Sequence, residues 1–169
     1  MSSAVILAFI GPPCAGKSTL AAEVARRLRI PHLSMDATRQ RLLPGAAHTR
    51  EDRAVAYRAM EWAAELVHAA GGSVILDAPY GSEEDREALR RLNALVIESH
   101  VSPETAVERS RGRGYDPERP DLTDEVVRQK VVEYQYAGGA LVLDTERLTA
   151  AECLEQTMGY LSSAGIAVS

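Results

Sequence analysis

The chain has 169 residues, of which 46% are hydrophobic, so it is long enough for one domain with a sizeable buried core. Its net charge of -5 and its pI of about 5.4 disfavour nucleic acid as a partner, because duplex binding needs a basic surface. Two cysteines are too few for a disulfide framework, and the apolar opening segment is too short for a signal peptide or a membrane span. The composition predicts one cytoplasmic domain over residues 1–169, with no membrane partner.

Short apolar runs alternate with helical patterns, and this alternation predicts a parallel α/β sheet. The predicted strands cover residues 4–10, 32–34, 73–76, 95–99 and 140–143. The predicted helices cover residues 17–28, 50–70, 82–92, 103–111, 123–136 and 149–162. In the long helix at 50–70, the apolar stripe of Val55, Ala59, Trp62 and Leu66 is expected to face the core. A segment rich in Gly, Pro and charge predicts a short lid at about 109–125.

A phosphate-binding motif follows the first predicted strand. Residues 11–18 read Gly-Pro-Pro-Cys-Ala-Gly-Lys-Ser, which fits the GxxxxGK[ST] pattern of a P-loop. Glycines let backbone N–H groups curl around phosphate oxygens, and the following helix directs its positive end at the same anion. The alternative is an ordinary glycine-rich turn between a strand and a helix. The motif predicts ATP as cofactor, with the candidate contacts Gly11, Cys14, Ala15, Gly16, Lys17, Ser18 and Thr19.

Two oxygen-bearing side chains are candidate ligands of Mg²⁺. In a P-loop the hydroxyl that follows the lysine, here Ser18, ligates the metal. Asp77 ends an apolar strand, where an aspartate often holds Mg²⁺ directly or through water. The alternative is that Asp77 only caps the next turn. We expect Ser18 and Asp77 to form the metal site, and Lys17 to reach the β- and γ-phosphates.

The candidate acceptor side follows the second predicted strand. Ligands of open α/β sheets sit beyond the carboxyl ends of the strands, which places Asp36 near an acceptor hydroxyl and Arg39 near a phosphate. The equally weighted alternative is that Asp36 caps a helix whose first turn contains Arg39. The lid and its approach contain four further arginines, of which one or two are expected to act on phosphates and the others to be solvated: Arg109, Arg111, Arg113 and Arg119.

These residues resemble the small P-loop kinases of the nucleotide-kinase-like class. The resemblance covers essentially the whole chain, and it includes chloramphenicol phosphotransferase, the kinase domain of phage polynucleotide kinase, zeta-toxins and AAA-type stand-alone kinases. It implies a three-layer P-loop fold with a five-stranded parallel sheet and the phosphate-loop strand at its centre. In these families an aspartate after the second strand is taken as the base for a hydroxyl acceptor, and Asp36 stands there.

The chain also resembles adenylate kinases in Asp36-x-x-Arg39 and in the stretch from Glu108 to Arg113. This second resemblance implies that Arg39 grips an acceptor phosphate, that Arg109 stacks on adenine and that Arg113 touches the phosphates. However, adenylate kinases have Asp-Gly-Phe-Pro-Arg after the third strand, where this chain has residues 77–81 with glycine in place of the arginine. The departure favours a hydroxyl acceptor over a phosphate acceptor.

The sequence therefore predicts an ATP- and Mg²⁺-dependent kinase acting on a small-molecule hydroxyl, such as that of an antibiotic, a nucleoside or a sugar. Its catalytic candidates are Lys17, Asp36, Arg39 and Arg113. Three alternatives stay open: a nucleoside monophosphate kinase, a polynucleotide 5′-hydroxyl kinase and an ATP-sensing switch. For the polynucleotide reading, the arginines between positions 39 and 58 would flank the acceptor strand.

Overall fold

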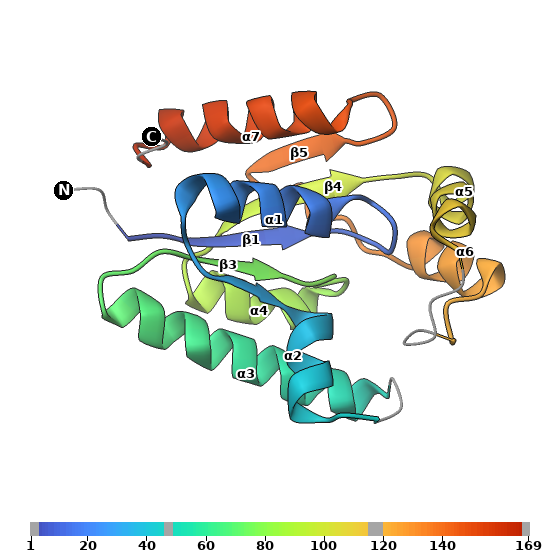
Figure 1. The fold of residues 1–169 in the computed structure, drawn as a ribbon, viewed down its shortest axis with the longest axis horizontal. Coiled ribbons are helices and arrows are strands. Elements are labelled where there is room, and N and C mark those ends of the chain that lie inside the picture. The colour runs from blue at the N-terminus through green and yellow to red at the C-terminus, as the bar shows by residue number, and fades with distance from the viewer. Residues whose placement is uncertain (1–3, 46–48, 115–119, 167–169) are drawn as a thin grey trace.

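The computed structural model describes residues 4–45, 49–114 and 120–166. Five parallel strands form one sheet in the order β2-β3-β1-β4-β5 (Figure 1). The strands are β1 (Ile6–Ile10), β2 (His32–Ser34), β3 (Val74–Asp77), β4 (Leu95–His100) and β5 (Leu141–Asp144). The helices are α1 (Lys17–Leu28), α2 (Met35–Leu42), α3 (Arg50–Ala69), α4 (Glu83–Arg91), α5 (Pro103–Arg113), α6 (Asp124–Val132) and α7 (Ala150–Ser163). The predicted parallel sheet, with the phosphate-loop strand at its centre, is confirmed.

Helices cover both faces of the sheet, which explains why the central strands are apolar throughout (Figure 1). Alternate residues of β1 point to opposite faces. Leu7 and Phe9 pack with α1 and α7, whereas Ile6, Ala8 and Ile10 pack with α3 and α4. Helices α2, α5 and α6 lie instead beyond the carboxyl ends of the strands. This leaves the carboxyl edge of β1, β2 and β3 as the floor of the site.

The predicted core stripe of α3 is wrong. Trp62 is 65% exposed and Leu66 is 54% exposed, whereas the buried face consists of Ala56, Met60 and Ala64. The helix is rich in alanine and therefore apolar on more than one face, so spacing alone does not select the face that packs. Small alanine side chains let α3 approach the sheet closely, and the larger Trp62 faces away from it.

Helix α2 was not among the predicted elements. Its eight residues are strongly polar and follow β2 without a turn residue between them. Ser34 occupies the N-cap position, so Asp36 lies in the first turn of α2 and is not the cap itself. A short helix with only two buried residues gives too weak a periodic signal to be predicted.

The predicted lid is described only at its two ends. Helix α5 extends to Arg113, and α6 begins at Asp124, while residues 115–119, including Arg119, lie outside the described residues. The ends of α5 and α6 pack through a small apolar cluster that also includes Ala15 of the phosphate loop. Of the helices within residues 4–45, 49–114 and 120–166, none has the length and apolar character that crossing a membrane requires.

A buried carboxylate fixes the segment that follows α6. Glu98 of β4 is 0% exposed and accepts hydrogen bonds from the N–H groups of Ala137 (2.7 Å) and Gly138 (3.0 Å). Oε2 of Glu98 also lies 3.0 Å from Nε2 of His100. Replacing Glu98 with alanine removes the acceptor of both N–H groups and is expected to lower the free energy of unfolding by about 2 kcal/mol. Urea denaturation measures this loss, and an unchanged midpoint would contradict it.

Candidate active site

The phosphate loop connects β1 to α1 with a backbone that only glycine tolerates at two positions. Gly11 has φ of 148°, and a Cβ there would lie 2.8 Å from the carbonyl oxygen of Ser99. Gly16 has φ of 84° and forms the N-cap of α1. Both conformations are costly for residues with a side chain. The glycines predicted from the motif therefore have a defined conformational role.

The N-terminus of α1 lacks the protein groups that satisfy most other helix starts in the described chain. Helices α3, α4 and α7 each begin with a capping box and have acidic residues in their first turn. Helix α1 has neither a side-chain cap nor an acidic residue in its first turn. Its first N–H groups and its positive end are thus left for an external anion. This arrangement fits the phosphates of a nucleotide.

Ser18 and Asp77 meet at the edge of the sheet. The hydroxyl of Ser18 donates to Oδ1 of Asp77 at 3.1 Å, and Asp77 is only 2% exposed. Oδ2 of Asp77 lies 3.1 Å from Nε2 of His32, which begins β2. Asp77 is therefore held by two side chains, and the alternative that it only caps the next turn has no hydrogen bond to support it among the described residues. The histidine contact was not predicted, because it depends on the register of β2 against β3.

This pair of oxygen ligands fits a magnesium ion. Mg²⁺ prefers oxygen ligands and keeps several waters, so a hydroxyl, one carboxylate and the oxygens of bound phosphates complete its shell. No cluster of three or more histidine, cysteine, aspartate or glutamate side chains suited to a metal occurs in the described chain. Such a cluster is not required for an ion that is shared with a nucleotide.

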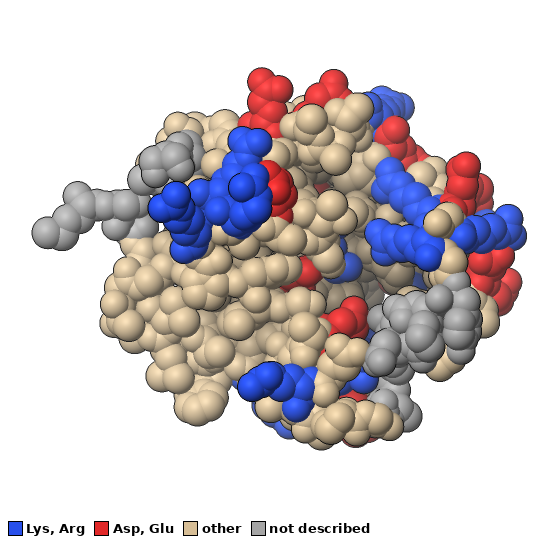
Figure 2. Space-filling view, viewed as in Figure 1, with Lys and Arg blue, Asp and Glu red and all other residues tan. Residues whose placement is uncertain are grey.

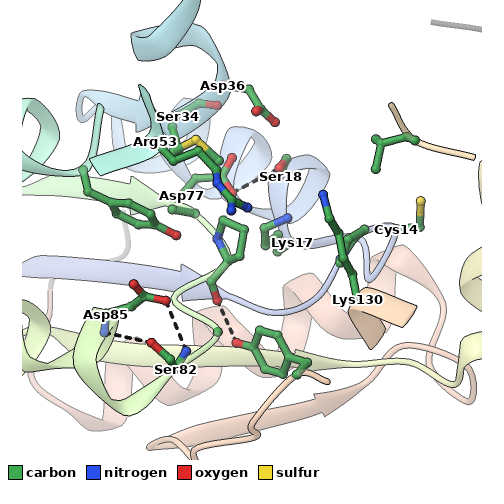
Figure 3. Close-up of a pocket in the computed structure, with 18 of the residues that line it drawn as sticks. Cys14, Lys17, Ser18, Ser34, Asp36, Arg53, Asp77, Ser82, Asp85 and Lys130 are labelled. Carbon is green, nitrogen blue, oxygen red and sulfur yellow. Dashed lines mark hydrogen bonds between the residues drawn. The ribbon is translucent and has the colours of Figure 1, made fainter. Parts of the chain in front are cut away.

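A cavity of about 560 Å³ opens beside the phosphate loop. Figure 2 shows this face of the molecule hollowed near the strand ends, with basic and acidic atoms in the hollow. Lys17, Ser18 and Asp77 line one side of the cavity, and Ser34 and Asp36 reach it from the start of α2 (Figure 3). The cavity size is in the range of small-molecule sites. The fold therefore brings the predicted phosphate, metal and acceptor residues to one place.

The predicted arginines are distributed unevenly around this cavity. Arg113, the last residue of α5, is exposed and lines it. Arg109 does not line it: its guanidinium donates to the carbonyl of Cys14 at 3.2 Å and to Thr145 after β5. Arg111 forms a surface ion pair with Asp124 at 2.7 Å.

Arg39 is also absent from the cavity lining. It lies in the last turn of α2, is only 4% exposed, and its Nε has no hydrogen-bond partner among the described residues. The predicted phosphate clamp at Arg39 therefore does not reach the cavity in this structure. Arg39 is buried in the protein, whereas Asp36, one turn earlier on α2, is exposed and lines the cavity.

Of the α3 residues that line the cavity, Arg53 was predicted only among the arginines of the polynucleotide alternative, and Tyr57 was not predicted. Arg53 and Tyr57 are one helical turn apart, so they lie on the same face of α3. The hydroxyl of Tyr57 accepts a hydrogen bond from the N–H of Tyr80 at 3.1 Å. Burial raises the pKa of Tyr57 far above its usual value, which keeps this hydroxyl protonated. In the sequence, the only indication of this pair is that Arg53 and Tyr57 are four residues apart within a predicted helix, which places them on one face.

Comparisons with known proteins identify the family and the fold. The family model described as an AAA domain matches residues 6–153. A gluconokinase from Sinorhizobium meliloti is 17% identical, with a TM-score of 0.72, and the match covers 96% of this chain and 94% of that one. A sugar kinase from Janibacter is 19% identical, with a TM-score of 0.75 and coverage of 96% of both chains.

A third similar structure contains a bound nucleotide analogue. The APS kinase of Mycobacterium tuberculosis in complex with AMPPNP and APS is 20% identical, with a TM-score of 0.75, covering 96% of this chain and 99% of that one. No curated protein matches the chain. At these identities the structures establish the fold, which is that of P-loop small-molecule kinases.

Proposed function

The chain belongs to the AAA domain family, and on this premise we propose that it is an ATP- and Mg²⁺-dependent kinase acting on a small-molecule hydroxyl. The observation that carries the proposal is a single cavity in which an uncapped phosphate loop faces the carboxylate of Asp36. A nucleotide switch needs the phosphate loop, but it does not need an acceptor carboxylate opposite. Solved kinases for sugars, gluconate and APS share the fold and support this choice.

In the proposed reaction, the acceptor hydroxyl oxygen attacks the γ-phosphorus of ATP. The bond from that phosphorus to the bridging oxygen breaks, ADP leaves, and the hydroxyl proton passes to Asp36. Lys17 and Arg113 neutralise negative charge on the phosphoryl oxygens in the transition state. Mg²⁺, held by Ser18 and Asp77, would supply charge neutralisation between the phosphates. Arg109 connects the phosphate loop to the loop after β5 through its hydrogen bonds to Cys14 and Thr145, so it lies on the side of the cavity that would bind the nucleotide.

The hydroxyl preference rests on the segment after β3. Gly81 lines the cavity at the position where adenylate kinases have an arginine for the acceptor phosphate. A Cβ at Gly81 would be in van der Waals contact with the ring of Tyr134, at 3.4 Å. At this position the chain therefore offers no cation to a nucleoside monophosphate.

The proposal is tested by ATP consumption with Mg²⁺ across pools of acceptors: sugars and sugar acids, nucleosides, nucleotides, antibiotics and 5′-hydroxyl oligonucleotides. We expect stimulation by one pool of hydroxyl-bearing small molecules. Stimulation by nucleoside monophosphates alone would overturn the hydroxyl preference. Tight AMPPNP binding without stimulation in any pool would favour the ATP-sensing switch.

The metal assignment has its own test. Replacing Ser18 with alanine removes the hydroxyl that lies 3.1 Å from Asp77 and is expected to raise the Mg²⁺ concentration for half-maximal activity about tenfold. Calorimetry of ADP binding at several Mg²⁺ concentrations checks the same loss without turnover. If the Mg²⁺ dependence of ADP binding is unchanged in this variant, Ser18 does not ligate the metal.

A further inference from the structure

Arg53 is a cation of the cavity that forms no ion pair with any described residue. It extends from α3 past Ser34 into the cavity, and its guanidinium points toward Lys17 and Asp77 (Figure 3). Its side chain is half-buried, and within the described chain it has no hydrogen-bond or ion-pair partner. A partly desolvated cation with no partner is unfavourable in the free protein, and it gains stabilisation when an anion binds.

Other charged side chains on this wall are already engaged. Arg50 forms an ion pair with Glu84 at 3.2 Å, and Asp85 accepts a hydrogen bond from the N–H of Ser82 as part of the capping box of α4. These contacts leave Arg53 as the cation of α3 that is available to a ligand.

The proposed donor nucleotide does not account for Arg53. Three cations of the cavity have no partner among the described residues: Lys17, Arg53 and Arg113. Lys17 belongs to the phosphate loop, and Arg113 is the last residue of α5. Arg53 comes from α3, the helix that packs against α2 and its Asp36. Its side chain therefore enters the cavity from the side of the acceptor.

Tyr57 adds a neutral donor beside this cation. Its hydroxyl oxygen accepts from Tyr80, which leaves its own proton to be donated into the cavity. One guanidinium and one hydroxyl on the same helix face match a group with two acceptor oxygens and one negative charge. A dianion is less suited, because the carboxylates of Asp36 and Asp85 act on the same region and repel it.

We propose that the acceptor is a hydroxy acid, whose carboxylate is bound by Arg53 and Tyr57 while its hydroxyl faces Asp36. This inference rests on the proposed kinase function and names the class of its acceptor. Arg53 then determines specificity for the acceptor and has no part in binding ATP.

The test compares matched acceptors that differ only in the acidic group. Aldonic acids are assayed beside the alditols of the same chain length and beside sugar phosphates, with wild type, Arg53→Gln and Arg53→Lys. The control is Arg58→Gln, an exposed arginine on the same helix that does not line the cavity. Thermal unfolding of each variant verifies that it is folded.

We expect the aldonic acid to be the preferred acceptor of the wild type. Arg53→Gln should raise its KM about 10- to 100-fold, the scale of a lost charge-assisted hydrogen bond, with the KM for ATP unchanged. Arg53→Lys should recover part of the loss, and Arg58→Gln should have no effect. Calorimetry of the aldonic acid with AMPPNP present should show the same loss of affinity.

Four results would overturn the inference. If the enzyme uses the aldonic acid and its alditol equally, it does not recognise a carboxylate, although the proposed kinase function stands. A preference for sugar phosphates would have the same meaning. Weaker AMPPNP binding in Arg53→Gln, with acceptor KM unchanged, would assign Arg53 to the nucleotide. If no acceptor of any class is phosphorylated, the proposed kinase function fails, and the acceptor assignment fails with it.

Discussion

Replacing Lys17 with methionine is expected to reduce turnover about 10³-fold, because the variant loses the positive charge that the phosphate loop directs at the transferring group. Methionine has a similar length and no charge, so the variant isolates the electrostatic contribution. Lys17 is half-buried, lines the cavity and has no ion-pair partner among the described residues. The substitution therefore breaks no ion pair among the described residues.

The effect should fall more on turnover than on nucleotide binding, because negative charge on the γ-phosphoryl oxygens is redistributed in the transition state. AMPPNP affinity is measured by calorimetry and the turnover number by ADP release. The matched control is Arg26→Met on the exposed side of the same helix, where the arginine only pairs with Glu23 at 2.7 Å. A variant at Lys17 with more than a tenth of wild-type turnover would remove this residue from the catalytic machinery.

The elements with strong local signals were predictable from the sequence. Helix α1 was predicted at its observed bounds, since an apolar period of four and the glycine before Lys17 both mark it. The strands were predictable because β1 and β3 are apolar on both faces, as a sheet covered by two layers of helices requires. By contrast, Trp62 was placed in the core because its spacing fits a helical stripe, but the packing of α3 depends on the shape of the sheet below it.

The site was predictable where chemistry is encoded in consecutive residues and not where it depends on packing. The phosphate loop is one continuous motif, and Asp77 follows an apolar strand, so the meeting of Ser18 with Asp77 could be anticipated. Arg39 could not be placed, because its direction depends on the short helix α2, which has a weak periodic signal. Arg53 was one arginine among several in the sequence, and only the cavity distinguishes it from Arg58.

Replacing Asp36 with asparagine is expected to reduce turnover about 10²-fold or more, because the variant cannot take a proton from the acceptor hydroxyl. Asparagine keeps the shape of the side chain and one acceptor oxygen, so the acceptor should still bind. Asp36 lines the cavity from the first turn of α2, and it does not belong to the phosphate loop. AMPPNP affinity should therefore change by less than about twofold, which calorimetry measures directly.

The loss of a negative charge in the first turn of a helix also has a small structural cost, of about 0.5 kcal/mol, through the helix dipole. Glu51→Gln controls for this cost, because Glu51 is an exposed acidic residue in the first turn of α3 and does not line the cavity. The control should keep full turnover. If Asp36→Asn also keeps full turnover, Asp36 does not take the proton of the acceptor hydroxyl. The carboxylate of Asp36 then only stabilises the N-terminus of α2. If turnover falls and AMPPNP affinity does not, the carboxylate acts on the acceptor, since the phosphate loop still binds the nucleotide without it.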